Sequence, residues 1–162
     1  MRRFLRAGAV TAVAAWLVFT TVTPANAATR HRIGDSSAST FATASAGDRL
    51  VTMQAPTGRA NQVWEFTLMS IGDRITSALT GGCLATPATW TGQNPPVVQR
   101  ACQGTPYERW QRVQTSSTTV AFRNAGLQDR CITIDRTLTP AHLFAHPCDF
   151  GATNQRFRLM AP

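Results

Sequence analysis

The stretch Asn61-Gln62-Val63-Trp64-Glu65-Phe66 returns twice further along the chain with few changes. Its two relatives are Tyr107-Glu108-Arg109-Trp110-Gln111-Arg112-Val113 and Asn154-Gln155-Arg156-Phe157-Arg158-Leu159. In each stretch a polar pair and one spacer precede a large aromatic residue, at position 64, 110 or 157, so that the steps are 46 and 47 residues. A period this regular predicts three copies of one structural unit, whose aromatic residues Trp64, Trp110 and Phe157 share a common core.

The beginnings of the three units also correspond to one another. Residues 74–85 open the second unit, residues 121–133 open the third, and residues 32–42 are the best match in the first. In this alignment Thr40 stands where the later units have a cysteine. The first unit is therefore expected to lack a disulfide, and the three units are expected to span approximately residues 30–68, 71–115 and 118–160.

Each unit has the pattern of short β-strands. Apolar residues form brief alternating groups, as in residues 49–53 and 96–99, and Gly, Pro, Asn and Asp interrupt them every few residues. After residue 27 no segment sustains a helical period with caps. About four strands in each of three units predict an all-β fold of about twelve strands, closed into a barrel with pseudo-threefold symmetry.

The first 27 residues have the three parts of a secretory signal. Three arginines stand among residues 1–6, an apolar run covers residues 7–22, and Ala25-Asn26-Ala27 supplies a small-residue cleavage site. We predict cleavage after Ala27, a single domain over residues 28–162, and a secreted protein. The alternative is a membrane anchor, but the run is shorter than the ~20 residues that a spanning helix needs.

Four cysteines follow this segment, namely Cys83, Cys102, Cys131 and Cys148. An even number in an exported chain indicates two disulfides, for which three pairings exist. The pairing Cys83–Cys102 and Cys131–Cys148 is favoured because its two intervals are alike. A zinc site is not expected, because no two of these cysteines form a close C-x-x-C pair.

The charge of the chain does not indicate a nucleic-acid partner. The sequence has 16 basic residues against eight acidic ones, and all of the basic ones are arginines. Without the three arginines of the signal, 13 basic residues remain, which leaves a net charge of +5. These arginines are scattered along the chain, whereas a nucleic-acid interface concentrates them.

Together these motifs resemble the ricin B-chain type of β-trefoil lectin domain. Gln62-Val63-Trp64 matches the family's Q-x-W motif fully, and Glu108-Arg109-Trp110 and Gln155-Arg156-Phe157 match it with one change each. The two cysteine pairs match the family's two cysteines per unit. The resemblance covers residues 28–162 and implies a β-trefoil fold that binds sugars.

The resemblance also shows where the sugar-binding residues have changed. The family has an aspartate two residues after the first cysteine, and the matching residues are Ala42, Ala85 and Thr133. It has an aromatic residue two before the second cysteine, where this chain has Arg100 and His146. None of the three residues at the aspartate position is acidic.

The third unit is expected to keep most of a pocket. There His146 can stack on a sugar, Asn154 can bond a hydroxyl, and Asp135 lies two residues beyond the lost aspartate. The neighbouring Gln155 is expected mainly to fix a turn, an alternative that is also open for Asn154. In the first unit only Asn61 has a counterpart in the family.

The sequence has no constellation that indicates catalysis, a cofactor or a metal. His142 and His146 are four residues apart, but no glutamate lies between them and Pro147 follows at once, so the segment is expected to be loop and strand and not a zinc-binding helix. No G-x-S-x-G elbow, phosphate loop or dinucleotide fingerprint is present. We therefore predict a protein that is not an enzyme.

The preferred function is a secreted, non-catalytic module that binds a glycan or a glycosylated surface. One alternative is a protein-interaction or receptor-binding subunit of a secreted complex, with a toxin or hydrolase as partner, similar to the binding subunits of cytolethal distending toxins. A further alternative is a protease inhibitor, for which residues 86–90 and 92–96 are candidate exposed loops.

Overall fold

The computed structural model describes residues 27–46 and 49–162. The predicted signal and its cleavage site lie outside these residues, apart from Ala27 itself. Within the described ranges, no helix is long and apolar enough to cross a membrane.

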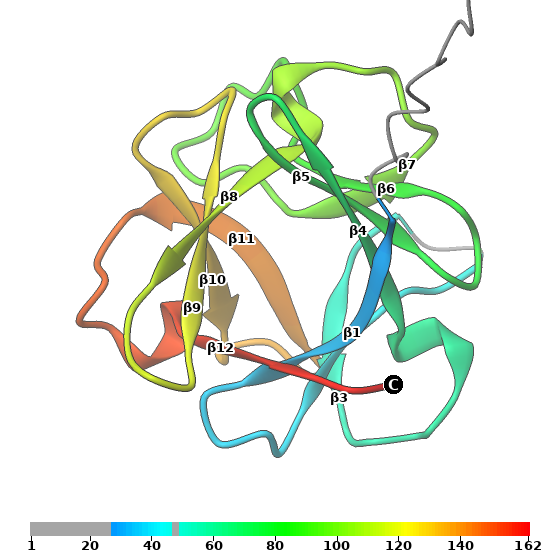
Figure 1. Cartoon of the computed structure of the whole chain (residues 1–162). Coiled ribbons are helices and arrows are strands. Elements are labelled where there is room, and N and C mark those ends of the chain that lie inside the picture. The colour runs from blue at the N-terminus through cyan, green and yellow to red at the C-terminus, as the bar shows by residue number, and fades with distance from the viewer. Residues whose placement is uncertain (1–26, 47–48) are drawn as a thin grey trace, which may run out of the picture.

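One order of elements occurs three times along the chain: three strands, a single turn of 3₁₀ helix, and a fourth strand (Figure 1). The elements are β1 (Thr29–Asp35), β2 (Phe41–Thr43), β3 (Thr52–Gln54), η1 (Ala60–Gln62), β4 (Trp64–Met69), β5 (Gly72–Ser77), β6 (Cys83–Ala85), β7 (Val98–Arg100), η2 (Pro106–Glu108), β8 (Arg109–Gln114), β9 (Val120–Asn124), β10 (Arg130–Asp135), β11 (Ala141–Pro147), η3 (Thr153–Gln155) and β12 (Phe157–Met160). The prediction of an all-β fold with about twelve strands is confirmed.

Six of these strands close a barrel. Antiparallel pairing runs from β1 to β12, then through β9, β8, β5 and β4, and returns to β1. The other six strands form three hairpins, β2–β3, β6–β7 and β10–β11. Closure gives every barrel strand two neighbours, so the barrel has no free edge.

The three hairpins are joined by a triangle of backbone hydrogen bonds. The N–H of Val51 donates to the carbonyl of Val97 (3.2 Å), Val97 donates to Leu143 (2.8 Å), and Leu143 donates back to Val51 (3.1 Å). Val51 and Val97 are fully buried, and Leu143 is 1% exposed. Since each unit contributes one corner, none of them can complete this contact alone.

Aromatic side chains fill the inside of the barrel. Trp64, Trp110 and Phe157 are fully buried and belong to one apolar cluster. The indole N–H of Trp64 donates to the carbonyl of Ala42 (2.9 Å), and that of Trp110 donates to Leu84 (2.8 Å). These bonds satisfy the only polar atom of each ring, which allows full burial.

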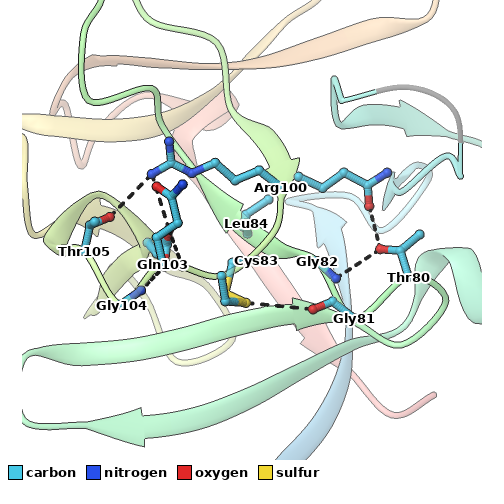
Figure 2. Close-up of a disulfide and its surroundings, with 12 residues drawn as sticks. Thr80, Gly81, Gly82, Cys83, Leu84, Arg100, Gln103, Gly104 and Thr105 are labelled. Carbon is cyan, nitrogen blue, oxygen red and sulfur yellow. Dashed lines mark hydrogen bonds and ion pairs between the residues drawn. A yellow bond between two sulfur atoms is a disulfide. The ribbon is translucent and has the colours of Figure 1, made fainter.

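The two predicted disulfides are confirmed as Cys83–Cys102 and Cys131–Cys148. Each ties the first strand of a hairpin to the segment after its second strand, and Figure 2 shows Cys83 beside Gly82 and Leu84. They lie in the second and third units.

The predicted alignment of the first unit is wrong by one residue. Phe41 pairs with Gly34 of β1, as Cys83 pairs with Thr76 of β5 and Cys131 with Arg123 of β9. Phe41, and not Thr40, therefore occupies the cysteine position. The aromatic ring lies against Gly34, where a Cβ would be 3.1 Å from its Cε1 atom. The same shift moves the family's acidic position from Ala42 to Thr43.

Candidate functional site

A cavity of about 420 Å³ opens on the third unit. Its walls come from β10 and the turn after it, from β11, and from η3. The lining residues are Thr133, Ile134, Asp135, Arg136, Thr137, His146 and Asn154. The structure thus brings Asp135, His146 and Asn154 together, although they lie on three different elements.

Asp135 presents a carboxylate that is already oriented. Its Oδ1 accepts hydrogen bonds from the hydroxyl (2.6 Å) and the backbone N–H (2.9 Å) of Thr137. These bonds hold the pKa of Asp135 below its ordinary value, so that the group is ionised at neutral pH. Among the described residues, only Oδ1 has hydrogen-bond partners, which leaves Oδ2 available to accept from a ligand.

His146 belongs to a row of rings along one face of β11. Its ring meets that of Phe144 edge to face, with the centroids 6.4 Å apart, and Phe144 stacks on His142 at 6.4 Å. All three rings are partly exposed, whereas Leu143 and Ala145 between them point into the core. The alternation of a strand therefore fixes His146 at the cavity.

Asn154 lies at the middle of η3 and is partly exposed. Its amide nitrogen makes a long hydrogen bond of 3.4 Å to the carbonyl of Ile134. The amide is thus directed toward β10, on the same cavity as Asp135. Part of its capacity for hydrogen bonds remains for a ligand.

Arg136 also lines this cavity, and the sequence did not indicate it. One of its Nη atoms donates to Oδ2 of Asp35, 3.2 Å away and 101 residues earlier in the chain. Asp35 is fully buried and also accepts from Ser37, Ser39 and Thr40. No sequence pattern links residues so far apart; the pairing of β1 with β12, and of β3 with β11, brings the first and third units together.

Gln155 does not face the cavity. It is 4% exposed, accepts from the N–H of Asp149 (2.8 Å) and donates to the carbonyl of Pro147 (2.9 Å). Gln62 in the first unit bonds to Thr57 and Ala55 in the same way. These glutamines tie the 3₁₀ turn to the segment that follows the hairpin.

Asn61 lies on the first unit, away from the other candidate residues. Its Oδ1 accepts from the hydroxyl of Thr57 (3.2 Å), and its carbonyl accepts from the N–H of Ala44. Both contacts serve the local loop. The structure thus gives Asn61 a local role and does not place it on the cavity of the third unit.

The residue at the family's acidic position is buried and is not a carboxylate in any of the three units. Thr43, Ala85 and Thr133 are each at most 4% exposed. The hydroxyls of Thr43 and Thr133 donate to the carbonyl two residues earlier, at 2.9 and 3.1 Å, so they are engaged within the strand. Only in the third unit does a carboxylate, Asp135, stand next to this position.

In the second unit, Arg100 is engaged in an ion pair with Glu108. Its Nη2 lies 3.3 Å from the fully buried carboxylate of Glu108. Figure 2 shows its guanidinium group reaching toward Thr105 and Gln103. This ion pair occupies the side chain that stands where the family has its aromatic residue.

The described residues contain no group of three His, Cys, Asp or Glu side chains that could hold a metal ion. His142 and His146 lie on strand β11 with Phe144 between them. The cavity of the third unit offers hydrogen-bond donors, acceptors and the aromatic ring of His146.

The fold is that of known β-trefoil proteins. A designed threefold-symmetric protein, ThreeFoil, superposes with a TM-score of 0.73 at 17% identity, over 82% of this chain and 99% of that one. The Macrolepiota procera ricin B-like lectin, solved in complex with lactose, gives 0.68 at 14% identity, over 88% and 100%. The Haemophilus ducreyi cytolethal distending toxin gives 0.66 at 16%, over 91% and 90%. The predicted β-trefoil is confirmed.

Four further matched structures are longer proteins, of which this chain spans between 17% and 32%. A comparison with curated protein sequences finds no match. The sequence does match the family model of the ricin-type beta-trefoil lectin domain over residues 29–157. Since this match covers most of the chain, from β1 to the start of β12, the chain belongs to the ricin-type beta-trefoil lectin domain family.

Proposed function

We propose that this protein is an exported, non-catalytic module that binds a glycan through the cavity of the third unit. The observation that carries the proposal is the convergence of Asp135, His146 and Asn154 on one open cavity of about 420 Å³. Membership of a family of lectin domains supports glycan binding. The two disulfides support export, because disulfides persist in oxidising compartments.

The chemistry of the cavity suits a sugar. The free oxygen of Asp135 accepts from a hydroxyl, and charge-assisted bonds of this kind are the strong ones. Asn154 offers a further amide, and the ring of His146 offers a flat surface to the C–H face of a pyranose. Directional polar groups beside one ring are what orients a small ligand in a pocket.

Asp135→Asn tests the proposal on a glycan array and by calorimetry with the glycans that bind. The loss of a charged acceptor is expected to weaken binding about tenfold or more. Asp149→Asn is the matched control, because Asp149 also accepts a backbone N–H two residues ahead, from Gly151 (2.9 Å), but lies outside the cavity. Equal affinities of both variants, or no glycan bound by the wild-type chain, would overturn the proposal.

A second candidate is a binding subunit of a secreted, toxin-like complex. It is supported by the loss of the family's aspartate at Thr43, Ala85 and Thr133, and by the likeness to the cytolethal distending toxin at the level of fold. Under this proposal the chain is recovered from its native medium in a stable complex with another protein. Gel filtration of that medium, followed by identification of co-eluting chains, separates the two candidates.

A further inference from the structure

Three arginines lie on neighbouring strands of the barrel wall. Arg74 belongs to β5, Arg109 to β8 and Arg123 to β9, and these strands are consecutive in the barrel (Figure 1). All three side chains are partly exposed, whereas a neighbouring residue on each strand is fully buried, namely Ile75, Trp110 and Phe122. Since side chains alternate along a strand, the arginines point away from the core. We name the surface formed by these three residues the arginine face.

The register of the strands sets the three cations close together. Arg74 and Arg109 are directly opposite each other in the pairing of β5 with β8, where Cβ atoms are typically about 5 Å apart. Arg123 is opposite Gln111, which lies two residues from Arg109 on the same side of β8. Like charges directly opposite each other destabilise a sheet, so an anion bound between them would offset an existing cost.

No acidic side chain of the described ranges pairs with these three arginines. The salt bridges found there involve other arginines, namely Arg30, Arg100, Arg112 and Arg136. Moreover, Nε of Arg74 and Nη1 of Arg109 are buried and have no hydrogen-bond partner among the described residues. A charge that is partly withdrawn from water is less screened, so both groups attract an anion more strongly than a fully solvated arginine does.

Arg123 is held in place beside an open cavity. Its Nε (2.9 Å) and its Nη2 (2.6 Å) both donate to Oε1 of Gln111. The two residues line a cavity of about 340 Å³, which Asp129 also lines without forming a salt bridge to any described arginine. The guanidinium is thus oriented before a ligand arrives, which lowers the entropy lost on binding.

We propose that the arginine face binds the sulfate or carboxylate groups of an acidic polysaccharide. A guanidinium presents its N–H groups as a planar fork that matches such an oxyanion, and hydrogen bonds between charged groups are the strong ones. Arginines on adjacent strands can bind neighbouring groups of one polymer, because the second contact is then intramolecular. The arginine face shares no residue with the cavity of the third unit and does not depend on the function proposed for it.

The rest of this wall favours a polysaccharide over a protein or a nucleic acid. A protein partner is held mainly by aromatic and other large side chains packed at the centre of the interface, and a single nucleic-acid strand stacks its bases on aromatic rings. Besides the arginines, the outward-facing residues of the three strands are Gly72, Thr76, Gln111, Val113 and Ala121. None of them is aromatic, so the face offers charges and hydrogen bonds, which the anionic groups and hydroxyls of an acidic polysaccharide can use.

The test measures binding of the exported chain to dextran sulfate and to polygalacturonate, by retention on the immobilised polymers and by calorimetry with the soluble ones. We expect at least one polymer to bind, and the binding to weaken as the salt concentration rises. Arg74→Gln and Arg109→Gln are each expected to weaken it about tenfold. Arg74→Lys keeps the charge but loses the planar fork, and its affinity should lie between those of Arg74→Gln and the wild-type chain.

Two further variants make the result specific. Arg59→Gln removes the same charge from an exposed position of the first unit, and is expected to leave the affinity unchanged. Asp129→Asn removes a carboxylate from the cavity beside Arg123, and is expected to strengthen binding. Urea titration checks that the variants are folded; Arg74→Gln should not lower the free energy of unfolding, because it removes a pair of like charges.

Several results would overturn this inference. An equal loss of affinity in Arg59→Gln and Arg74→Gln would mean that only the net charge matters. Polyglutamate bound as tightly as the polysaccharides would assign the face to an acidic protein. Inorganic sulfate that displaces the polymer at the same concentration of sulfate groups would make the face a site for a free ion.

The same measurements separate this inference from the proposed function. Asp135→Asn is expected to bind the acidic polymers as the wild-type chain does, because Asp135 lies outside the arginine face. If Arg74→Gln and Arg109→Gln bind the polymers as the wild-type chain does while Asp135→Asn weakens glycan binding, the arginine face is wrong and the proposed function stands. If the two arginine variants lose affinity and Asp135→Asn has no effect on any glycan, the arginine face stands and the cavity of the third unit is wrong.

Discussion

Asp35 shows how one buried carboxylate can link two units. It is fully buried, accepts hydrogen bonds from three neighbouring residues, and pairs with Arg136 of the third unit. Burial alone would raise the pKa of Asp35, but the bonds from Ser39, Arg136 and Ser37 outweigh it and lower the pKa to about 2. The group therefore stabilises the fold as an anion and places Arg136 at the cavity.

This shift predicts a specific loss of stability in acid. Because the folded pKa lies below the unfolded one, the contribution is present above about pH 4 and is lost as the pH falls toward 2. It amounts to about 2 kcal/mol. We expect Asp35→Asn to lower the free energy of unfolding by about 3 kcal/mol at pH 6, and to reduce its change between pH 5 and pH 2, both measured by urea titration.

Ser39→Ala removes one hydroxyl bond to Asp35 and should lower the free energy of unfolding at pH 6 by a smaller amount. This variant replaces Asp35→Asn in the test if Asp35→Asn does not fold. The same acid dependence in Asp35→Asn as in the wild-type chain would contradict this account.

Single residues also mark where the sequence was sufficient and where it was not. Asp135, His146 and Asn154 could be placed on one pocket, because a resemblance supplied the spacing that joins three separate elements. The sequence did not show that Phe41 is the residue equivalent to Cys83 and Cys131. A phenylalanine has no feature in common with a cysteine by which the two positions could be aligned. Arg136 was missed as a site residue because its contact with Asp35 depends on tertiary packing.

At the level of elements, the second unit has exchanged a hydrogen-bonded glutamine for an ion pair. Gln62 and Gln155 each accept from one backbone N–H and donate to one carbonyl. Glu108 cannot donate; it accepts from Gln103 and Gly104 and pairs with Arg100 of β7. The ion pair therefore holds η2 against the hairpin where the other units use an amide.

This exchange predicts that Arg100 and Glu108 contribute to stability as a pair, so that the effects of replacing them are not additive. Glu108→Gln leaves a cation that is 22% exposed without its partner, and Arg100→Gln leaves a fully buried carboxylate without its cation. We expect each change to lower the free energy of unfolding by about 2 kcal/mol. The double variant has glutamine at both positions, as the first unit has at the equivalent Gln54 and Gln62, leaves no unpaired charge, and should lose clearly less than the sum.

The measurement is a double-mutant cycle, in which urea titration gives the free energy of unfolding of the wild-type chain, both single variants and the double variant. Additive losses would show that the two side chains act independently. The sequence indicated that the polar pair of this unit had changed, but the compensation by Arg100 depends on the register that sets β7 beside β6.

At the scale of the whole molecule, the period of the aromatic residues was sufficient to predict a closed, threefold barrel. Trp64, Trp110 and Phe157 lie where a shared core requires them. What the period could not supply is the contact between the hairpins. The triangle formed by Val51, Val97 and Leu143 uses only backbone atoms, so the pattern of side chains in the sequence does not predict it.

The triangle predicts that the three units unfold together. The backbone N–H groups of Val51, Val97 and Leu143 should exchange with solvent deuterium only through global unfolding, with the same free energy. Replacing the third unit's disulfide, in Cys131→Ala with Cys148→Ala, opens a loop of 17 residues and should lower that free energy by about 3 kcal/mol. All three amides should lose the same amount, although only Leu143 belongs to the altered unit.

The amide of Thr137 is the internal control, because it bonds to the side chain of Asp135 in an exposed turn and should exchange by local opening in both proteins. If Leu143 alone lost protection in the variant, the third unit would unfold by itself and the triangle would not couple the hairpins. Equal losses at all three corners would instead mean that the cavity of the third unit depends on the stability of the other two units, since no unit closes the barrel alone.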